Sequence, residues 1–149
     1  MKETCLVMIK PGILNRRIVG EVISRLEKKG PNLIGMKLLQ VSNELAAKHY
    51  EEHFGKDFYN QLIEYITSGP VIAMVWEAED CCAIIRRIVG SSGALRGEPG
   101  TIRGDYCMHN NRNVIHASDK PESAKKEVAL YFTESELHSW TDEHDGKWK

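Results

Sequence analysis

Residues 71–77 read Val-Ile-Ala-Met-Val-Trp-Glu, and this stretch decides the fold. Apolar residues occupy both alternating positions of the run, which predicts a strand that is buried on both faces in the centre of a sheet. Ser68-Gly69-Pro70 comes directly before the strand and predicts the end of a helix. Asp80 follows the strand and predicts the start of another helix. A buried strand between two helices indicates helices packed on a sheet.

The rest of the chain alternates between strand and helix patterns. Short apolar runs predict strands, whereas apolar residues spaced three or four apart predict helices. Ser42, Asp57 and Asp80 are predicted to cap three of the helices, and Asp119, with Glu122 three residues later, resembles a capping box for a fourth. The predicted strands are residues 5–9, 33–41, 71–77 and 113–115, and the predicted helices with their caps are residues 17–29, 42–53, 57–67, 80–90 and 119–132.

These elements follow one another as strand, helix, strand, helix, helix, strand, helix, loop, strand and helix. This order predicts an α/β (α+β) sandwich with a ferredoxin-like four-stranded antiparallel sheet covered by helices. A long loop, residues 91–112, is inserted before the last strand, and loops of this length are usually functional. The polar tail after residue 132 contains Trp140 and Trp148 as predicted anchors. We expect residues 1–149 to form a single domain.

Composition and charge limit the classes of function. Lys+Arg 20 and Asp+Glu 21 give a formal net charge of -1, which argues against a general nucleic-acid binder. No apolar run approaches the roughly 20 residues of a membrane span. Lys10-Pro11 interrupts the apolar run near the start, so we expect neither a membrane partner nor a secretory signal. The four cysteines include no C-x-x-C pair and are expected to be reduced thiols in a cytoplasmic protein.

Four side chains suited to phosphate binding or catalysis stand at the predicted ends of elements. Lys10 ends the first strand, Arg86 lies on the polar side of the helix before Gly90, and Arg103 lies in the long loop. His116 follows the last strand. Ligand sites in open α/β sheets gather at strand ends near helix N-termini, so the four residues together predict a site for a phosphate-bearing ligand.

The blocks around these side chains resemble the nucleoside diphosphate kinase family. Residues 113–119 read Asn-Val-Ile-His-Ala-Ser-Asp and residues 99–105 read Pro-Gly-Thr-Ile-Arg-Gly-Asp, as in the family's active-site region. Ser68-Gly69-Pro70-Val71 and Lys10-Pro11 agree with the family in order and spacing. The resemblance runs from about residue 3 to residue 132, and less clearly to residue 148.

The resemblance implies an enzyme that transfers the terminal phosphoryl group of a nucleoside triphosphate to a nucleoside diphosphate. The reaction is a ping-pong transfer through phosphohistidine at His116. Imidazole suits this role because its unperturbed pKa of about 6.5 leaves it largely neutral and nucleophilic at pH 7. By resemblance, Glu127 orients the ring through its other nitrogen and Ser118 lies beside His116. Lys10 and Tyr50 complete the implied catalytic set.

The same resemblance implies a set of nucleotide-binding residues. Mg²⁺ is expected to arrive on the nucleotide phosphates, with no metal ligand from the side chains. The family forms homo-oligomers, and the long C-terminal tail favours a hexamer over a tetramer. The implied nucleotide contacts are Arg86, Arg103 and Ser92 to the phosphates, Lys10 and Asn113 to ribose and phosphate, and Phe58 and Leu62 to the base.

Three places depart from the family pattern. Gly12-Ile13 follows Lys10-Pro11, where the usual pair is Asp-Gly. Ala117 replaces a glycine beside His116, and an alanine fits there only if its φ is negative. Ser92-Gly93-Ala94 stands where Thr-Asn-Pro is common, so the long loop lacks a stiffening proline.

Two alternatives stay open on the sequence. One is a catalytically weak relative that acts as a nucleotide-binding or scaffold module, which the departures in the loop permit. The other is a zinc hydrolase, because His49-Tyr50-Glu51-Glu52-His53 fits the H-x-x-E-H pattern of inverted zinc peptidases. No third ligand is identifiable in the sequence, so His49 and His53 are predicted to be surface histidines on a solvated helix face.

Overall fold

The computed structural model describes residues 1–92, 97–109 and 112–141. The predictions for Gly93, Ala94 and Trp148 lie outside these residues. The strands are β1 (Lys2–Ile9), β2 (Asn32–Leu39), β3 (Val71–Glu79) and β4 (Ile115–Ala117). The helices are α1 (Pro11–Arg16), α2 (Val19–Lys29), α3 (Asn43–His49), α4 (Tyr59–Thr67), α5 (Cys81–Val89), α6 (Ile102–Tyr106) and α7 (Pro121–Tyr131), with short 3₁₀ turns η1 (Glu51–His53) and η2 (Glu134–Glu136).

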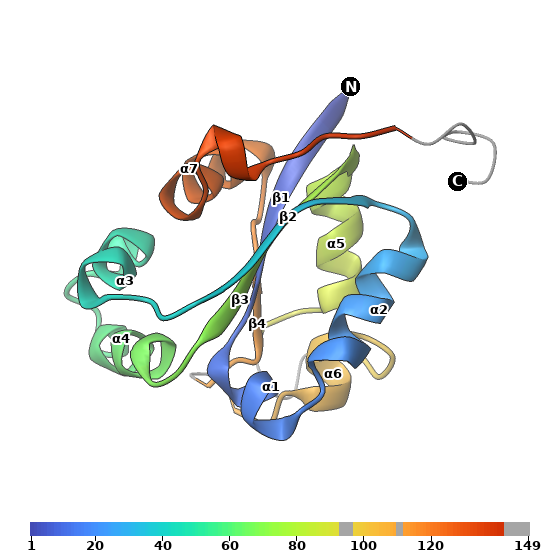
Figure 1. The fold of residues 1–149 in the computed structure, drawn as a ribbon. Coiled ribbons are helices and arrows are strands. Elements are labelled where there is room, and N and C mark those ends of the chain that lie inside the picture. The colour runs from blue at the N-terminus through green and yellow to red at the C-terminus, as the bar shows by residue number, and fades with distance from the viewer. Residues whose placement is uncertain (93–96, 110–111, 142–149) are drawn as a thin grey trace.

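The four strands form one antiparallel sheet in the order β2-β3-β1-β4, which confirms the predicted ferredoxin-like fold. β3 is central, as its two apolar faces predict, and pairs with β1 over its whole length, from Lys2↔Glu79 to Ile9↔Ile72. Figure 1 shows the sheet edge-on between two groups of helices, with α3, α4 and α7 on one side and α2 and α5 on the other. Both central strands therefore need apolar side chains on both faces.

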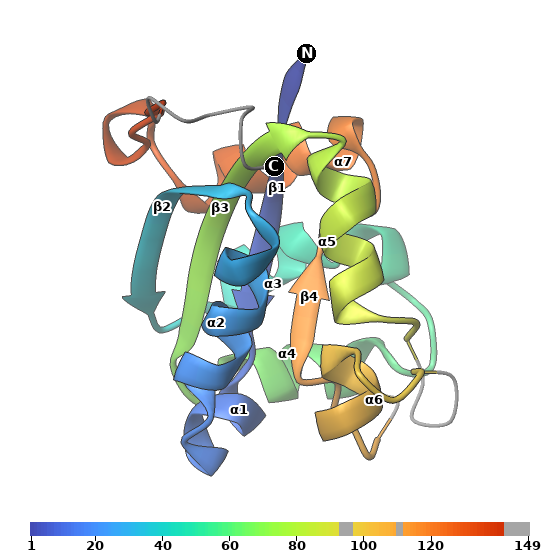
Figure 2. The same cartoon turned by 90° about the vertical axis from the view of Figure 1, so that its right-hand side faces the viewer.

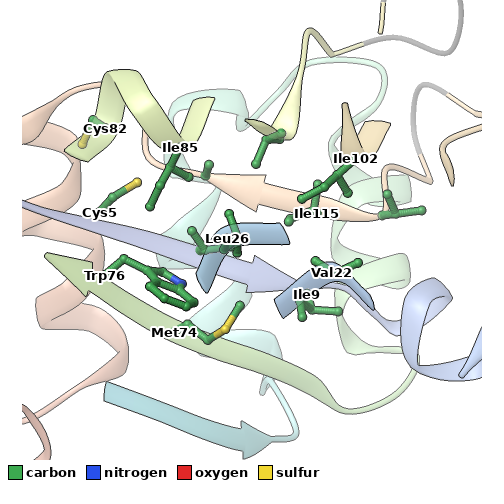
Figure 3. Packing of buried hydrophobic residues seen from close by; sticks show 14 of the residues in the cluster. Cys5, Ile9, Val22, Leu26, Met74, Trp76, Cys82, Ile85, Ile102 and Ile115 are labelled. Carbon is green, nitrogen blue, oxygen red and sulfur yellow. The ribbon is translucent and has the colours of Figure 1, made fainter. Parts of the chain in front are cut away.

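Alternation along β1 divides its side chains between two cores. Cys5, Val7 and Ile9 pack under α2 and α5 with Trp76, as Figure 3 shows for the labelled residues Cys5, Ile9 and Trp76. Leu6 and Met8 point to the opposite face, where they join a core formed with α3, α4 and α7. Trp76 is fully buried, and truncating such a side chain to alanine typically costs about 3–5 kcal/mol.

Several predicted helix boundaries were wrong. The predicted helix 17–29 is preceded by α1, and Arg17, at φ 60, ends α1 in the left-handed conformation. Ser42 caps α3 by accepting from the Leu45 amide, as predicted, but α3 ends at His49 and a 3₁₀ turn follows. Phe58 is the N-cap of α4 in place of Asp57, with no side-chain cap bond.

The other two predicted caps also differ from the structure. Asp80 is the N-cap of α5, as predicted, but its φ is 53 and its carboxylate makes no cap bond to the helix. Lys120, not Asp119, is the N-cap of α7, because Pro121 begins the helix one residue later than expected. The capping-box prediction with Glu122 is therefore wrong.

The long loop contains a helix that the sequence did not predict. α6 is only five residues long and is held by Thr101, whose hydroxyl accepts from the Gly104 amide. β4 begins two residues later than the predicted strand. In the tail, the indole of Trp140 donates to the Leu33 carbonyl at 3.0 Å, which confirms this residue as an anchor. No helix in the described part of the chain is long and apolar enough to cross a membrane.

Candidate active site

His116 lies at the middle of β4, opposite Met8 of β1. Its neighbours Ile115 and Ala117 are buried in the core under α2 and α5. Because successive side chains of a strand point to opposite faces, His116 faces the side where α3, α4 and α7 pack. In Figure 2, β4 lies beside α5, with α3, α4 and α7 behind the sheet. The imidazole therefore lies between the sheet and those helices, about one-fifth exposed.

Glu127, from the middle of α7, fixes the orientation of this imidazole. Its Oε1 lies 2.9 Å from Nε2 of His116 and accepts from the Ser118 hydroxyl at 2.7 Å. Burial alone would raise the pKa of Glu127, but the hydrogen bonds from His116 and Ser118 outweigh it and hold the pKa below its ordinary value. Ser118 is fully buried and also accepts from the Leu6 amide, so the carboxylate is tied to β1. Glu127 stays ionised and keeps Nε2 of His116 engaged, so Nδ1 is the ring nitrogen that this carboxylate leaves free.

His49 also lies against His116, which corrects the prediction of a solvated surface histidine. The two rings meet edge-on with their centroids 4.8 Å apart, and Nδ1 of His49 lies 2.7 Å from the Tyr131 hydroxyl. Burial, reinforced by the nearby charge of His116, lowers the pKa of His49 to about 3. The sequence carried a signal for this position. His49 is three residues after Ala46, which is buried in α3, and so shares its inward face.

Three basic side chains converge on the same region. Lys10 stands between β1 and α1, with its ammonium 6.0 Å from the ring centre of Tyr50. Burial, together with the charge of Arg103, lowers the pKa of Lys10 from 10.5 to about 8. Arg86 of α5 donates to the Ala117 carbonyl at 3.1 Å, which places its guanidinium beside His116. These groups supply positive charge where a polyphosphate would need it.

Arg103 joins α6 to the strand that carries His116. Its guanidinium donates to Oδ1 of Asn113 at 3.1 Å, to the Gly90 carbonyl at 2.9 Å and to the Ile115 carbonyl at 3.0 Å. Burial, with Arg86 nearby, lowers its pKa to about 10. Asn113 is itself fixed, because Oδ1 also accepts from the Ile115 amide. A short helix in the long loop is therefore what positions Arg103.

These side chains line one cavity of about 480 Å³. Every residue of the predicted catalytic and nucleotide-binding sets lines it except Ser118, which supports it from behind through Glu127. Tyr50 is buried there, and burial raises the pKa of its hydroxyl. The predicted residues that line the cavity are Lys10, Tyr50, Phe58, Leu62, Arg86, Ser92, Arg103, Asn113, His116 and Glu127. The lining also includes residues that the sequence did not single out for this site, among them His49, His53, Asp119, Ser123 and Lys126.

The departures from the family pattern fit the structure where it describes them. Ala117 is a β4 residue and is not among the positive-φ residues, so its methyl group causes no strain. Gly12, the second residue of α1, donates its amide to the Tyr65 hydroxyl at 3.1 Å, and Ile13 is fully buried in the core. The turn after Lys10 is therefore built on a packed isoleucine and a contact to α4.

The H-x-x-E-H pattern is not a complete metal site among the described residues. His49 instead gathers with His116 and Glu127, where one candidate ligand atom from each lies within 4.8 Å of the others. His53 packs on Phe58, with the ring centres 5.4 Å apart, and Nδ1 of His53 lies 3.2 Å from the Lys56 ammonium. The two histidines of the pattern therefore lie in different parts of the cavity, His49 beside His116 and His53 beside Phe58.

The chain was compared with known protein families and with curated sequences. A family model described as nucleoside diphosphate kinase matches residues 3–137. The nucleoside diphosphate kinase of Listeria monocytogenes serotype 4b is 51% identical over 138 residues, which cover 93% of this chain and 94% of the relative. That of Carboxydothermus hydrogenoformans is 52% identical over 138 residues, covering 93% of each.

Solved structures agree with the sequence matches. A halophilic nucleoside diphosphate kinase from Halobacterium salinarum, in complex with CDP, matches with a TM-score of 0.95 and 40% identity, covering 99% of this chain and 98% of that chain. A nucleoside diphosphate kinase family protein from Babesia bovis matches with a TM-score of 0.92 and 37% identity, covering 97% and 98%. Fold, sequence and length therefore agree over nearly the whole chain.

Proposed function

The chain belongs to the nucleoside diphosphate kinase family, and we propose that His116 is the residue that carries its phosphoryl group. The chain is a phosphotransferase that moves the terminal phosphoryl group of a nucleoside triphosphate to a nucleoside diphosphate by a ping-pong reaction. The observation that carries our assignment is the cavity in which His116 meets Lys10, Arg86 and Arg103. The proposed nucleophile and the basic residues proposed to bind the substrate phosphates therefore line the same cavity.

In the first half-reaction, Nδ1 of His116 attacks the terminal phosphorus. The nitrogen lone pair forms the new bond to phosphorus while the bond to the bridging oxygen breaks, and the nucleoside diphosphate leaves with that electron pair. The ring gains positive charge as it is phosphorylated, and the carboxylate of Glu127, 2.9 Å from Nε2, stabilises that charge. The second half-reaction is the reverse, with a different diphosphate as the attacking group.

The phosphates are held by groups that neutralise the charge of the transferring unit. Phosphoryl transfer depends mainly on positioning and electrostatic stabilisation, which is what Arg86, Arg103 and Lys10 supply. Tyr50, buried beside Lys10, is placed to donate its hydroxyl proton to the transferring group. Ser92 adds a hydroxyl and Asn113 an amide, and both line the cavity.

The nucleoside is proposed to lie against Phe58 and Leu62 at the α4 end of the cavity. Stacking on an aromatic ring suits any base, because every base has an apolar face, so we expect broad acceptance of nucleotides. The Halobacterium relative was solved with CDP, which supports a nucleoside diphosphate as ligand.

Members of the family need a divalent cation, and we propose that it is Mg²⁺ carried by the nucleotide. The cavity fits this arrangement, because its basic residues can hold the nucleotide phosphates that carry the ion. The acidic residues Glu51, Glu52 and Asp119 also line the cavity. Mg²⁺ is usually held by substrate phosphates and water, and it supplies neutralisation of phosphate charge. No side-chain cage for it is required.

We also propose a homo-oligomer, with a hexamer favoured over a tetramer, and a cytoplasmic location. The edge strand β2 exposes Met36 and Leu38, which supports contact with another copy of the chain. All four cysteines are free and buried, which supports a reducing compartment. Light scattering of the native protein and cell fractionation test these two proposals.

Radiolabelling tests the assignment of His116. Incubation with a triphosphate labelled on its terminal phosphate should give an acid-labile, base-stable label that passes to added diphosphate. His116→Ala should abolish the label, whereas the control variant His138→Ala, at an exposed position outside the cavity, should keep it. Label that persists in His116→Ala overturns the assignment. Nucleotide binding without any label in the parent protein would favour the scaffold alternative.

A further inference from the structure

We propose that His49, His116 and Glu127 bind a zinc-class divalent ion in the nucleotide-free protein, and that this ion inhibits phosphorylation of His116. The inhibition rests on the function proposed above, whereas the binding does not. The ligand atoms come from the end of α3, from β4 and from α7, so the ion would join three elements around one point.

The geometry of these three side chains is close to that of a metal site. One ring nitrogen of each histidine and one carboxylate oxygen of Glu127 lie within 4.8 Å of one another, and all three residues are half-buried. Tetrahedral ligands about 2.0–2.2 Å from zinc stand roughly 3.3–3.6 Å apart, so small side-chain rotations would bring the atoms into range. The Tyr131 hydroxyl at 2.7 Å from Nδ1 of His49 holds that ring, as a polar partner does for a metal-bound imidazole.

The donor set favours zinc over magnesium. Two imidazoles and one carboxylate form a set used by catalytic zinc, with the fourth position open to water. Mg²⁺ prefers oxygen ligands in an octahedral arrangement and keeps several waters, so the ion that accompanies the nucleotide does not compete well for two nitrogens. The cavity beside the three residues gives access to the ion and to its water.

Binding of the ion would disable the nucleophile. The Nε2–Glu127 contact is 2.9 Å long, so an ion ligated by both groups takes the place of the proton between them. A cation on Nε2 withdraws electron density from the ring and opposes the positive charge that phosphorylation creates. Glu127 would then neutralise the metal ion instead of the phosphorylated ring.

Equilibrium dialysis of the nucleotide-free protein against Zn²⁺ tests the binding. We expect one ion per chain in the parent, affinity at least tenfold lower in His49→Gln and Glu127→Gln, and parent affinity in the matched control His53→Gln. Co²⁺ should give a tetrahedral visible spectrum in the parent and in His53→Gln only. Equal binding by His49→Gln and the parent, or loss of binding in His53→Gln, overturns the proposal, as does the absence of any bound ion. Circular dichroism confirms that each variant is folded.

Phosphorylation of His116 from a labelled triphosphate in excess Mg²⁺ tests the inhibition. Preincubation with Zn²⁺ should slow labelling at least tenfold in the parent, and a chelator should restore the rate. A Zn²⁺-loaded parent that is labelled at the metal-free rate overturns the inhibitory role. A parent that binds Zn²⁺ but is never labelled, even without the ion, would instead contradict the proposed function of His116.

Discussion

Lys10 is a buried lysine, 6% exposed, and this environment makes its charge depend on pH in the range where the protein is handled. Burial and Arg103 lower its pKa from 10.5 to about 8. Between pH 8 and pH 10.5 the folded protein therefore binds fewer protons than the unfolded chain. Burial of the charged ammonium lowers the free energy of unfolding below pH 8, and this loss of stability is relieved as the pH rises toward 10.5.

The same titration predicts a pH-dependent affinity for nucleotides. As Lys10 loses its proton above pH 8, a cation that we assign to the phosphates disappears. The affinity for a nucleoside diphosphate should fall roughly tenfold between about pH 7.5 and about pH 9, measured by calorimetry. Lys10→Arg should bind with little change over this range, since an arginine stays charged. An equal fall in both proteins would show that another group controls the affinity.

The site residues differ in how far the sequence could predict them. Lys10, Arg86 and His116 stand beside strand ends or on a periodic helix, and a family resemblance covers them, so their convergence was predictable. His49 was predicted to lie on the surface, because the sequence around it is polar. The sequence of α3 alone does not show which other element packs on the face that carries His49. Its contact with Tyr131 joins residues 82 apart in the chain, and only the tertiary fold brings them together.

At the scale of elements, Arg103 and Arg86 differ in how much each contributes to stability, although both are assigned to the phosphates. To described groups outside its own helix, Arg103 of α6 makes three hydrogen bonds, whereas Arg86 of α5 makes one, to Ala117. Arg103→Ala should lower the free energy of unfolding by about 2–4 kcal/mol, because it leaves buried acceptors unpaired. Arg86→Ala is expected to lower it by less than about 1 kcal/mol, because this side chain is exposed.

Urea denaturation of the two variants, beside nucleotide titrations, checks this contrast. Both should bind a nucleoside diphosphate at least tenfold more weakly, since each removes a phosphate contact. If Arg103→Ala unfolds at the same urea concentration as Arg86→Ala, the hydrogen bonds that join Arg103 of α6 to β4 and its neighbours do not contribute to the free energy of unfolding.

The errors in the predicted elements have a common physical cause. The strands and long helices follow from periodicity, because their apolar faces must be buried wherever they pack. Asp57 and Asp119 are good cap residues, yet Phe58 and Lys120 hold the cap positions, so backbone geometry outweighed side-chain preference. α6 has too few residues to show a period, and it is held by Thr101 and by the contacts of Arg103.

The junction between α1 and α2 gives a prediction on stability. Arg17 has φ 60 and ψ 39, a left-handed conformation that costs a non-glycine residue about 1 kcal/mol or more. Arg17→Gly should raise the free energy of unfolding by about 0.5–1 kcal/mol, measured by urea denaturation. Arg16→Gly is the matched control one residue earlier: it should lower stability by about 1 kcal/mol, because it lies within α1 and contacts Tyr106. The same sign of change in both variants would contradict the assigned strain.

At the scale of the whole molecule, one edge of the sheet bears on assembly. In the described part of the chain β2 has β3 as its strand partner, and the tail covers the start of its other edge, where His138 and Trp140 donate to the Ile34 and Leu33 carbonyls. Farther along β2, Met36 and Leu38 are 53% and 65% exposed on the same face. An exposed apolar edge strand is a template for pairing with a second chain. A contact between β2 edges joins copies in pairs, and three such pairs would complete the hexamer that we propose.

Charged substitutions on β2 should therefore disrupt the contact that joins two copies of the chain. We expect the native protein to scatter light as a particle of about six times its 16.9 kDa chain, and the double variant Met36→Glu/Leu38→Glu to scatter as a smaller particle, because the paired contacts are lost. Phe54→Glu is the matched control, because Phe54 is 78% exposed but lies outside the sheet. A double variant that keeps the full native mass would show that the chains associate through another surface. A tetrameric mass for the native protein would exclude the hexamer and leave the β2 contact to be judged by the double variant.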